Sequence, residues 1–474
     1  STTRPAGRDH HRRGHAGRAD LQHEDYTMTM RDDLGLAVSG ADADSLSHYQ
    51  TALTRFQCYV GDPVAEVDAA LARRPEMVMA HVLKAWLHLL GTDAPGLAVA
   101  DQAYRTASAL PGTEREKAHL AAISELLAGR WHAAGQVLED LTITWPHDSL
   151  ALQAGHLIDF YTGQQRLLRD RIARAMPEWR EGQPGYHALL GMLAFGLEEN
   201  ADYAAAERTG RRSVELQPRD GWGQHAVAHV LEMQNRTEEG VAWMRERVEH
   251  WAGDSFFQVH NWWHLALYHL DREQVDEVLA LFDGPIFGGR STLALDLVDA
   301  SALLWRLELL DVDVGPRWQP LADLWEAHAD SGNYAFNDAH AMMAFVGAGR
   351  GQAIERIFAA QRRAMAEDND NRRFTAEVGH PLCLAIEAFA GGEYAECVRL
   401  LRPLRAIAQR FGGSHAQRDL LDLTLLEAAR RSGQEALARA LANERLQLRP
   451  RSPQTRRLAL RVTEVRGGRA TAVP

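Results

Sequence analysis

Cysteine is scarce in this sequence. Among 474 residues there are only Cys58, Cys383 and Cys397, and no two of them are close in the chain. Disulfide frameworks and thiolate metal sites need cysteines in pairs or clusters, so both are disfavoured and a cytoplasmic, reducing environment is expected. Long apolar runs are also missing. None reaches the roughly 18 residues of a membrane-spanning helix, so no membrane partner is expected.

Excess positive charge and the common nucleotide motifs are absent as well. The formal net charge is -12, which argues against a nucleic-acid or anionic-membrane partner. No P-loop, dinucleotide fingerprint or nucleophile elbow occurs, so no nucleotide cofactor is expected. Phosphoryl transfer, hydride transfer and acyl-enzyme chemistry are therefore disfavoured. Hydrolysis, hydration and elimination by acid/base or metal action remain open.

The two ends of the chain lack the patterns of a folded domain. Residues 1–29 are basic and rich in histidine, without apolar periodicity and without the apolar core of a signal peptide. They are predicted to be a disordered leader or sequence upstream of the natural start. The segment 461–474 is predicted to be a C-terminal tail. One helical array is expected over residues 30–460.

Helical periodicity runs almost without interruption from Asp32 onward, and strand patterns are few. Turns rich in Gly, Asn and Pro divide the periodic segments. Two segments carry a capping box, with a hydroxyl residue followed three positions later by Glu or Gln: Thr113 with Glu116, and Ser414 with Gln417.

An internal repeat predicts the architecture. A small or apolar residue in one helix is followed twelve residues later by a second one and then by Pro, at Ala122/Ala134/Pro146, Ala194/Ala206/Pro218 and Leu426/Ala438/Pro450. The first two positions recur at Ala228/Gly240, Ala266/Val278, Ala341/Ala353 and Ala385/Cys397. This register is typical of tetratricopeptide-like helix pairs. It predicts an all-α solenoid of about nine to eleven pairs, forming a superhelix with a concave groove.

Histidines gather in two neighbouring repeats. HAVAH carries His225 and His229, and HNWWH carries His260 and His264. A spacing of four residues places both imidazoles of a pair on one helix face. In the repeat register, these helix faces line the concave groove. The four histidines are predicted to bind a divalent metal such as Zn, Fe, Mn or Co. The alternative is a polar network of neutral histidines with Asn261 and the backbone.

Further groove residues follow from the same register. Glu232, with His229 and His264, is predicted to be catalytic, and Glu232 is expected to transfer the proton. Asp296, Asp299 and Arg306 are interpreted as a charge network. Trp222 is interpreted as core or, if it faces the groove, as a flat apolar wall for a small ligand. The predicted binding residues, which lie on first helices of repeats or at their starts, are His225, His260, Asn261, Trp263, Glu198, Asn337, His340, His380, His415 and Arg418.

Five segments together resemble the tetratricopeptide repeat protein 38 family: HAVAHVLEM, HNWWHLALY, FNDAHAMMAF, GHPLCLA and GGSHAQRDL. The resemblance covers roughly Asp32 to Arg461 and implies an α-solenoid, but it implies no reaction. The residues that match the family's motif positions are His225, His229, His260, Asn261, His264, His340, His380 and His415.

Two classes of function follow. The first is a small-molecule site in a concave pocket rich in His and Glu, acting as a metal-dependent or acid/base hydrolase or lyase. The alternative is a non-catalytic scaffold that binds a protein or peptide in the groove. A homo-oligomer is compatible with either class. An enclosed pocket requires a plugged superhelix, and residues 32–60 and 285–330 are the candidate plugs.

Overall fold

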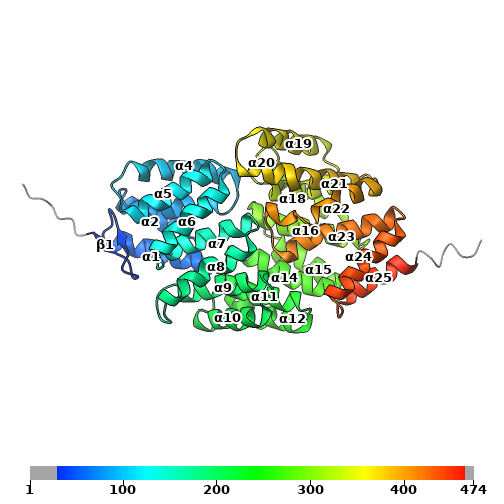
Figure 1. Cartoon of the computed structure of the whole chain (residues 1–474), viewed down its shortest axis with the longest axis horizontal. Helices are drawn as coiled ribbons and strands as arrows, with labels where there is room; N and C mark the ends of the chain where they lie inside the picture. The colour runs from blue at the N-terminus through cyan, green and yellow to red at the C-terminus, as the bar shows by residue number, and fades with distance from the viewer. Residues whose placement is uncertain (1–28, 465–474) are drawn as a thin grey trace, which may run out of the picture.

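A computed structural model describes residues 29–464, and this part of the chain is built almost entirely of α-helices (Figure 1). The described β-structure is small. Strands β1 (Met30–Arg31) and β2 (Ala37–Val38) pair antiparallel, and one isolated bridge joins Val60 to Ser255. Among the described helices, none has the length and apolar content needed to cross a membrane.

The helices follow one another with short connections. The first helices are α1 (Ala43–Cys58), α2 (Pro63–Arg73), α3 (Val78–Leu89), α4 (Ala94–Ser108), α5 (Glu114–Leu127), α6 (Trp131–Thr144), α7 (Ser149–Tyr161), α8 (Gln165–Ala175), α9 (Tyr186–Glu199) and α10 (Tyr203–Leu216). The middle of the chain forms α11 (Gly221–Met233), α12 (Thr237–Arg245), α13 (Val248–Trp251), α14 (Gln258–Asp271), α15 (Val275–Leu281), α16 (Ala294–Leu309) and α17 (Trp318–Trp325). The last are α18 (Ala335–Ala348), α19 (Gly351–Ala366), α20 (Asp370–Phe374), α21 (His380–Ala390), α22 (Tyr394–Leu404), α23 (His415–Arg431), α24 (Glu435–Leu448) and α25 (Pro453–Glu464).

Successive helices pack as antiparallel pairs. Over residues 29–464 there are eleven such pairs, which agrees with the predicted number: α1–α2, α3–α4, α5–α6, α7–α8, α9–α10, α11–α12, α14–α15, α16–α17, α18–α19, α21–α22 and α23–α24. Helix α25 covers the end of the array, and the predicted boundary at residue 460 falls inside it. The predicted α-solenoid of tetratricopeptide type is confirmed. Residues 1–28 and 465–474, where most of the predicted leader and tail lie, are outside the described residues.

The repeat positions are small because helices touch there. Ala228 and Ala266 are fully buried, and Gly240 of α12 lies against the ring of Tyr268 in α14. A Cβ atom at Gly240 would come within 2.4 Å of that ring, so a larger residue would push the two helices apart. The register therefore reflects close packing between the first and second helices of neighbouring pairs.

The predicted helix ends are also correct. Thr113 and Ser414 each accept a hydrogen bond from the backbone amide three residues on, and Glu116 and Gln417 complete the two capping boxes. Pro146, Pro218 and Pro450 each stand two residues beyond the end of a second helix, namely α6, α10 and α24. Proline cannot continue a helix, so it ends each pair and lets the chain turn to the next one.

The solenoid closes on itself. The amide of Asp370 donates to the carbonyl of Gly129 at 3.0 Å, and the ring of Trp131 stacks on Tyr334 with centroids 5.1 Å apart. At the other end, α25 packs against α14, and the Ser452 hydroxyl donates to Asp271. Early and late helix pairs thus lie side by side (Figure 1). These contacts between distant helix pairs cover part of the concave face.

Candidate metal centre and adjoining cavity

Four histidine side chains from two neighbouring first helices converge. His225 and His229 lie one turn apart on α11, and His260 and His264 lie one turn apart on α14. Asp220 begins α11 by accepting a hydrogen bond from the amide of Gly223, which fixes the first turn before the histidines. One nitrogen from each of the four imidazoles lies within 4.8 Å of all the others. These residues could hold one metal ion.

Two carboxylates stand behind the cluster. Asp299 of α16 lies 2.9 and 3.0 Å from Nδ1 of His260 through its two oxygens. Glu232 of α11 lies 3.2 Å from Nδ1 of His264. Each carboxylate therefore faces the outer nitrogen of a histidine, which leaves the inner nitrogen, Nε2, directed into the cluster.

The inner nitrogens are close to one another. Nε2 of His260 lies 3.1 Å from Nε2 of His225 and 3.3 Å from Nε2 of His264. A carboxylate on Nδ1 draws the proton of a neutral imidazole to that nitrogen, so Nε2 carries a lone pair. His260 and His264 then point lone pairs at each other, and a hydrogen bond between them would need an extra proton.

Burial disfavours that extra proton. It lowers the pKa of His225, His229 and His264 well below the ordinary value, and the neighbouring histidines lower it further by mutual repulsion. Neutral imidazole is the form that binds a metal. The cluster is thus arranged as a set of neutral nitrogen donors.

His229 and Glu198 form an extension of the cluster toward α9. Nδ1 of His229 lies 3.6 Å from a Glu198 carboxylate oxygen, and both side chains are fully buried. Within residues 29–464, neither nitrogen of His229 and neither oxygen of Glu198 has a hydrogen-bond partner. Burial raises the pKa of Glu198, and the nearby carboxylates of Glu199 and Glu232 raise it further. Buried polar atoms without partners call for a ligand, a water or an ion. Glu198, Glu199 and His229 could hold a second cation.

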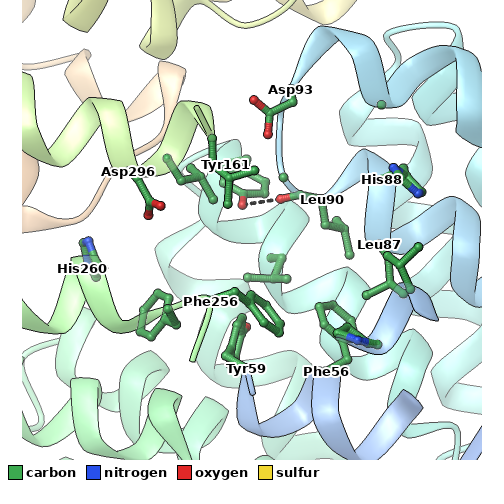
Figure 2. Close-up of a pocket in the computed structure, with 18 of the residues that line it drawn as sticks. Phe56, Tyr59, Leu87, His88, Leu90, Asp93, Tyr161, Phe256, His260 and Asp296 are labelled. Atoms are coloured by element: carbon green, nitrogen blue, oxygen red, sulfur yellow. Dashed lines mark hydrogen bonds between the residues drawn. The ribbon is translucent and has the colours of Figure 1, made fainter. Parts of the chain in front are cut away.

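A cavity of about 810 Å³ opens onto one side of the histidine cluster (Figure 2). Of the four histidines, His225 and His260 line it, and 15% of the His260 side chain is exposed. Carboxylates line it as well, from Asp62, Asp93, Asp296 and Asp299. The aromatic lining consists of Phe56, Tyr59, Phe160, Tyr161, Trp222, Phe256 and Phe257. A cavity of this size and composition suits a small organic molecule.

Both predicted plugs contribute to the walls. Phe56 and Tyr59 come from the segment 32–60, while Leu293, Asp296 and His328 come from the segment 285–330. Figure 2 shows Tyr59 and Phe56 across the cavity from Asp296 and Asp93. Both candidate plugs therefore supply residues to the cavity wall.

The predicted catalytic residues lie behind the cavity wall. Glu232, His229 and His264 are not among its described lining residues, and Glu232 lies beside Arg449, 3.8 Å from its guanidinium. Two predicted binding residues, Asn261 and Trp263, support the cluster. Asn261 donates to the carbonyl of Gly221 at 3.5 Å, and the Trp263 ring stacks on His260 with centroids 5.4 Å apart.

The remaining predicted binding residues are spread over other contacts. Asn337 donates to the hydroxyl of Thr92 at 3.0 Å, His340 contacts the carbonyl of Phe336, and His380 contacts Gln361. His415 packs against Glu199, and Arg418 reaches both His415 and the carbonyl of Gly413. These five side chains do not line the cavity, although Ser414 and Gln417 beside them do.

Two interpretations from the sequence need correction. Asp299 belongs to the histidine cluster and not to a charge network with Arg306, because Arg306 instead reaches Asp419 at 3.6 Å and the carbonyl of Ala416. Asp296 lines the cavity, where burial raises its pKa to about 7 against a hydrogen bond from Ser291. Trp222 is both core and cavity wall.

No motif or periodicity in the sequence points to Asp93. This residue lies about two hundred positions from Asp296, and only closure of the ring brings the two to one cavity. The i, i+3 spacing of Asp296 and Asp299 was the one local signal for the acidic wall.

Comparison with known proteins adds little at the level of function. No protein-family model matches the chain. Solved structures with a related arrangement include a monomeric mutant of IFIT1 with Gppp-AAAA, at 13% identity and a TM-score of 0.38, covering 90% of this chain and 96% of that one. Another is yeast Tom70, at 12% identity and a TM-score of 0.32, covering 90% and 89%. A likeness this distant does not identify a ligand of this chain.

Proposed function

We propose that this protein binds a divalent metal ion, with zinc as the best fit, through His225, His229, His260 and His264, and that the adjoining cavity brings a small organic molecule to it. One observation carries the proposal. His260 and His264 each have a carboxylate on Nδ1, and their Nε2 atoms face each other at 3.3 Å. Two neutral imidazoles in these tautomers repel each other, whereas a cation between them turns both lone pairs into ligands.

The spacing supports a tetrahedral ion. Zinc–nitrogen bonds of about 2.0–2.1 Å in a tetrahedron place neighbouring ligand nitrogens about 3.3 Å apart. Two of the six separations, the Nε2 distances of 3.1 and 3.3 Å from His260, match that edge length, and all four histidines offer a nitrogen within 4.8 Å of the others. Asp299 and Glu232 fit the usual supporting role of a carboxylate, which holds the ring orientation of a metal-binding histidine and makes it a stronger donor.

Access to the ion defines what the site can do. His225 and His260 line the cavity, so a molecule inside it reaches the ion from their side. Four histidine ligands fill a tetrahedral ion, so a substrate carbonyl group or a water would reach it only as a fifth ligand or by displacing one imidazole; a divalent ion opened in that way would supply Lewis-acid activation. Hydrolysis or elimination on a small substrate therefore stays the proposed reaction class. Glu232 fits an orienting role behind His264 better than direct proton transfer, because it lies outside the cavity wall.

A non-catalytic scaffold is the second candidate. The helix-pair solenoid itself favours it, since such repeats commonly present extended surfaces to proteins or peptides. The covered concave face leaves the outer surfaces for such a partner. The sequence resemblance to the tetratricopeptide repeat protein 38 family is compatible with either candidate, and membership of that family stays a prediction.

Metal analysis tests the proposal directly. The full chain, free of affinity tags and with His10, His11 and His15 replaced by Ala, would be purified, exposed to zinc, desalted and assayed by mass spectrometry. We expect about one zinc per chain, and a loss of most of it in His264→Ala because one ligand is removed.

The matched control is His340→Ala, which removes another buried histidine outside the cluster and should keep its zinc. Circular dichroism would verify that both variants are folded. Equal zinc content in His264→Ala and the parent protein would place the ion elsewhere. A parent protein without zinc, iron, manganese or cobalt would leave the scaffold as the better explanation.

A further inference from the structure

The described cavity wall carries carboxylates without a lysine or arginine to balance them. Its carboxylates come from Asp62, Asp93, Asp296 and Asp299, and none of the described lining residues is Lys or Arg. A carboxylate or phosphate on a ligand would therefore meet like charges without a cationic side chain to pair with. In a partly dry cavity such repulsion is strong, because the local dielectric is low.

Three of these four carboxylates are held by a backbone amide or a histidine. Asp62 is exposed and caps α2 through the amide of Ala65, and Asp93 accepts from the amide of Ala294 at 2.9 Å. Asp299 is held by His260. Asp296, in the first turn of α16, accepts a side-chain hydrogen bond from Ser291 but has neither a salt bridge nor a backbone donor among residues 29–464, and its side chain extends into the cavity (Figure 2). It is the carboxylate best placed to meet a ligand.

The opposite wall is aromatic. Tyr59, Trp222 and Phe257 form a contiguous group, with Tyr59 stacked on Trp222 at a centroid distance of 5.7 Å and Trp222 lying 5.4 Å from Phe257. Aromatic faces attract flat apolar groups and cations alike. His225 also lines the cavity, and its buried Nδ1 has no hydrogen-bond partner in the described part of the chain.

We infer that the ligand of this cavity is an amine, with an aromatic or other apolar body against Tyr59 and Trp222 and its charged nitrogen beside Asp296. The inference rests on the proposed small-molecule site and narrows its ligand to one chemical class. The acidic wall selects positive charge, and the aromatic wall supplies most of the contact area. Neutral molecules of the same shape should bind more weakly, and anionic ones more weakly still.

Three probes that share an indole ring separate these cases: tryptamine, which is cationic; tryptophol, which is neutral; and indole-3-propionate, which is anionic. Their binding to the full chain would be measured by isothermal titration calorimetry at pH 8, with and without bound zinc. We expect tryptamine to bind at least tenfold more tightly than tryptophol, and indole-3-propionate to bind no better than tryptophol. Asp296→Asn should abolish the preference for tryptamine and leave tryptophol binding unchanged.

Asp62→Asn is the matched control, because it makes the same change at the exposed rim, where asparagine can still cap α2. It should alter tryptamine binding less than twofold. The inference is overturned if indole-3-propionate binds best, if Asp296→Asn keeps the preference, or if none of the three probes binds at millimolar concentration. Zinc content, measured on the same samples, reports separately on the proposed function.

Discussion

Two regions of the ring contain buried or partly buried histidines on first helices of repeats, and they differ in how those histidines are partnered. In α18 and α21 each histidine has its own neutral partner, since Nδ1 of His340 contacts the carbonyl of Phe336 and Nδ1 of His380 contacts the amide oxygen of Gln361. In α11 and α14 the histidines face one another, with carboxylates on their outer side. The first arrangement brings no two imidazole lone pairs together, although Nε2 of His340 has no hydrogen-bond partner within residues 29–464. In the second, opposing lone pairs need a cation. Similar motifs in the sequence thus lead to different chemistry.

The largest expected effect of this difference is on stability after metal removal. Zinc that binds only the folded state stabilises it by about 4 kcal/mol when its free concentration is a thousand times Kd. Chelation should lower the unfolding free energy of the parent protein and of His340→Ala by about this amount, as measured by urea denaturation. His264→Ala should not respond to the chelator. If chelation lowers the unfolding free energy of His264→Ala by the same amount, the two regions do not differ in metal binding.

Acid should lower the folding stability by protonating histidines that have neutral partners, such as His340. Burial lowers the pKa of His340 to about 4, whereas in the unfolded chain it is near 6.5. The unfolded state therefore takes up the proton first, and stability is lost as the pH falls from about 6.5 to 4, by up to about 3 kcal/mol. With metal chelated in both proteins, the stability gap between the parent protein and His340→Asn should narrow across this range. A gap that does not change with pH would contradict the neutral assignment of His340.

The carboxylates behind the cluster should have an intermediate effect. Replacing a group that orients a metal-binding histidine typically weakens the metal affinity tenfold to a hundredfold. We expect this range for Asp299→Asn and for Glu232→Gln, measured by competition with a zinc-binding dye. Asp338→Asn, a buried carboxylate in the other region, is the control and should leave the affinity unchanged. A complete loss of zinc in Glu232→Gln would instead make Glu232 a direct ligand.

The smallest expected effect comes from replacing two helix-capping residues, of which one also lines the cavity. Ser414 caps α23 and also lines the cavity, whereas Thr113 caps α5 and is not among the described lining residues. Replacing either by Ala should cost about 1 kcal/mol of stability, measured by denaturant unfolding. Ser414→Ala alone should change tryptamine binding. If Thr113→Ala alters tryptamine binding equally, the binding depends on the overall stability of the solenoid and not on contacts within the cavity.

Much of the fold could be predicted because its signals are local. The small-residue register, the prolines after second helices and the two capping boxes each depend on neighbouring residues, and each is found as expected. The convergence of His225, His229, His260 and His264 followed from the same register. The lining of the cavity did not follow from that register, because Asp93 and Asp296 come to one cavity only when the ring closes. The place of Glu232 behind the wall could not be foreseen either, since it depends on how α11 turns within its pair.

The contacts between α6 and the α18–α20 region limit how the number of repeats can vary during evolution. An open solenoid tolerates gain or loss of a repeat, because each unit touches only its neighbours. Here the contacts of Gly129 with Asp370 and of Trp131 with Tyr334 join distant units, so one unit more or fewer between them would break the seam. The number of repeats between these two points is thereby locked, and variation is expected to accumulate in loop lengths and outer helix surfaces instead.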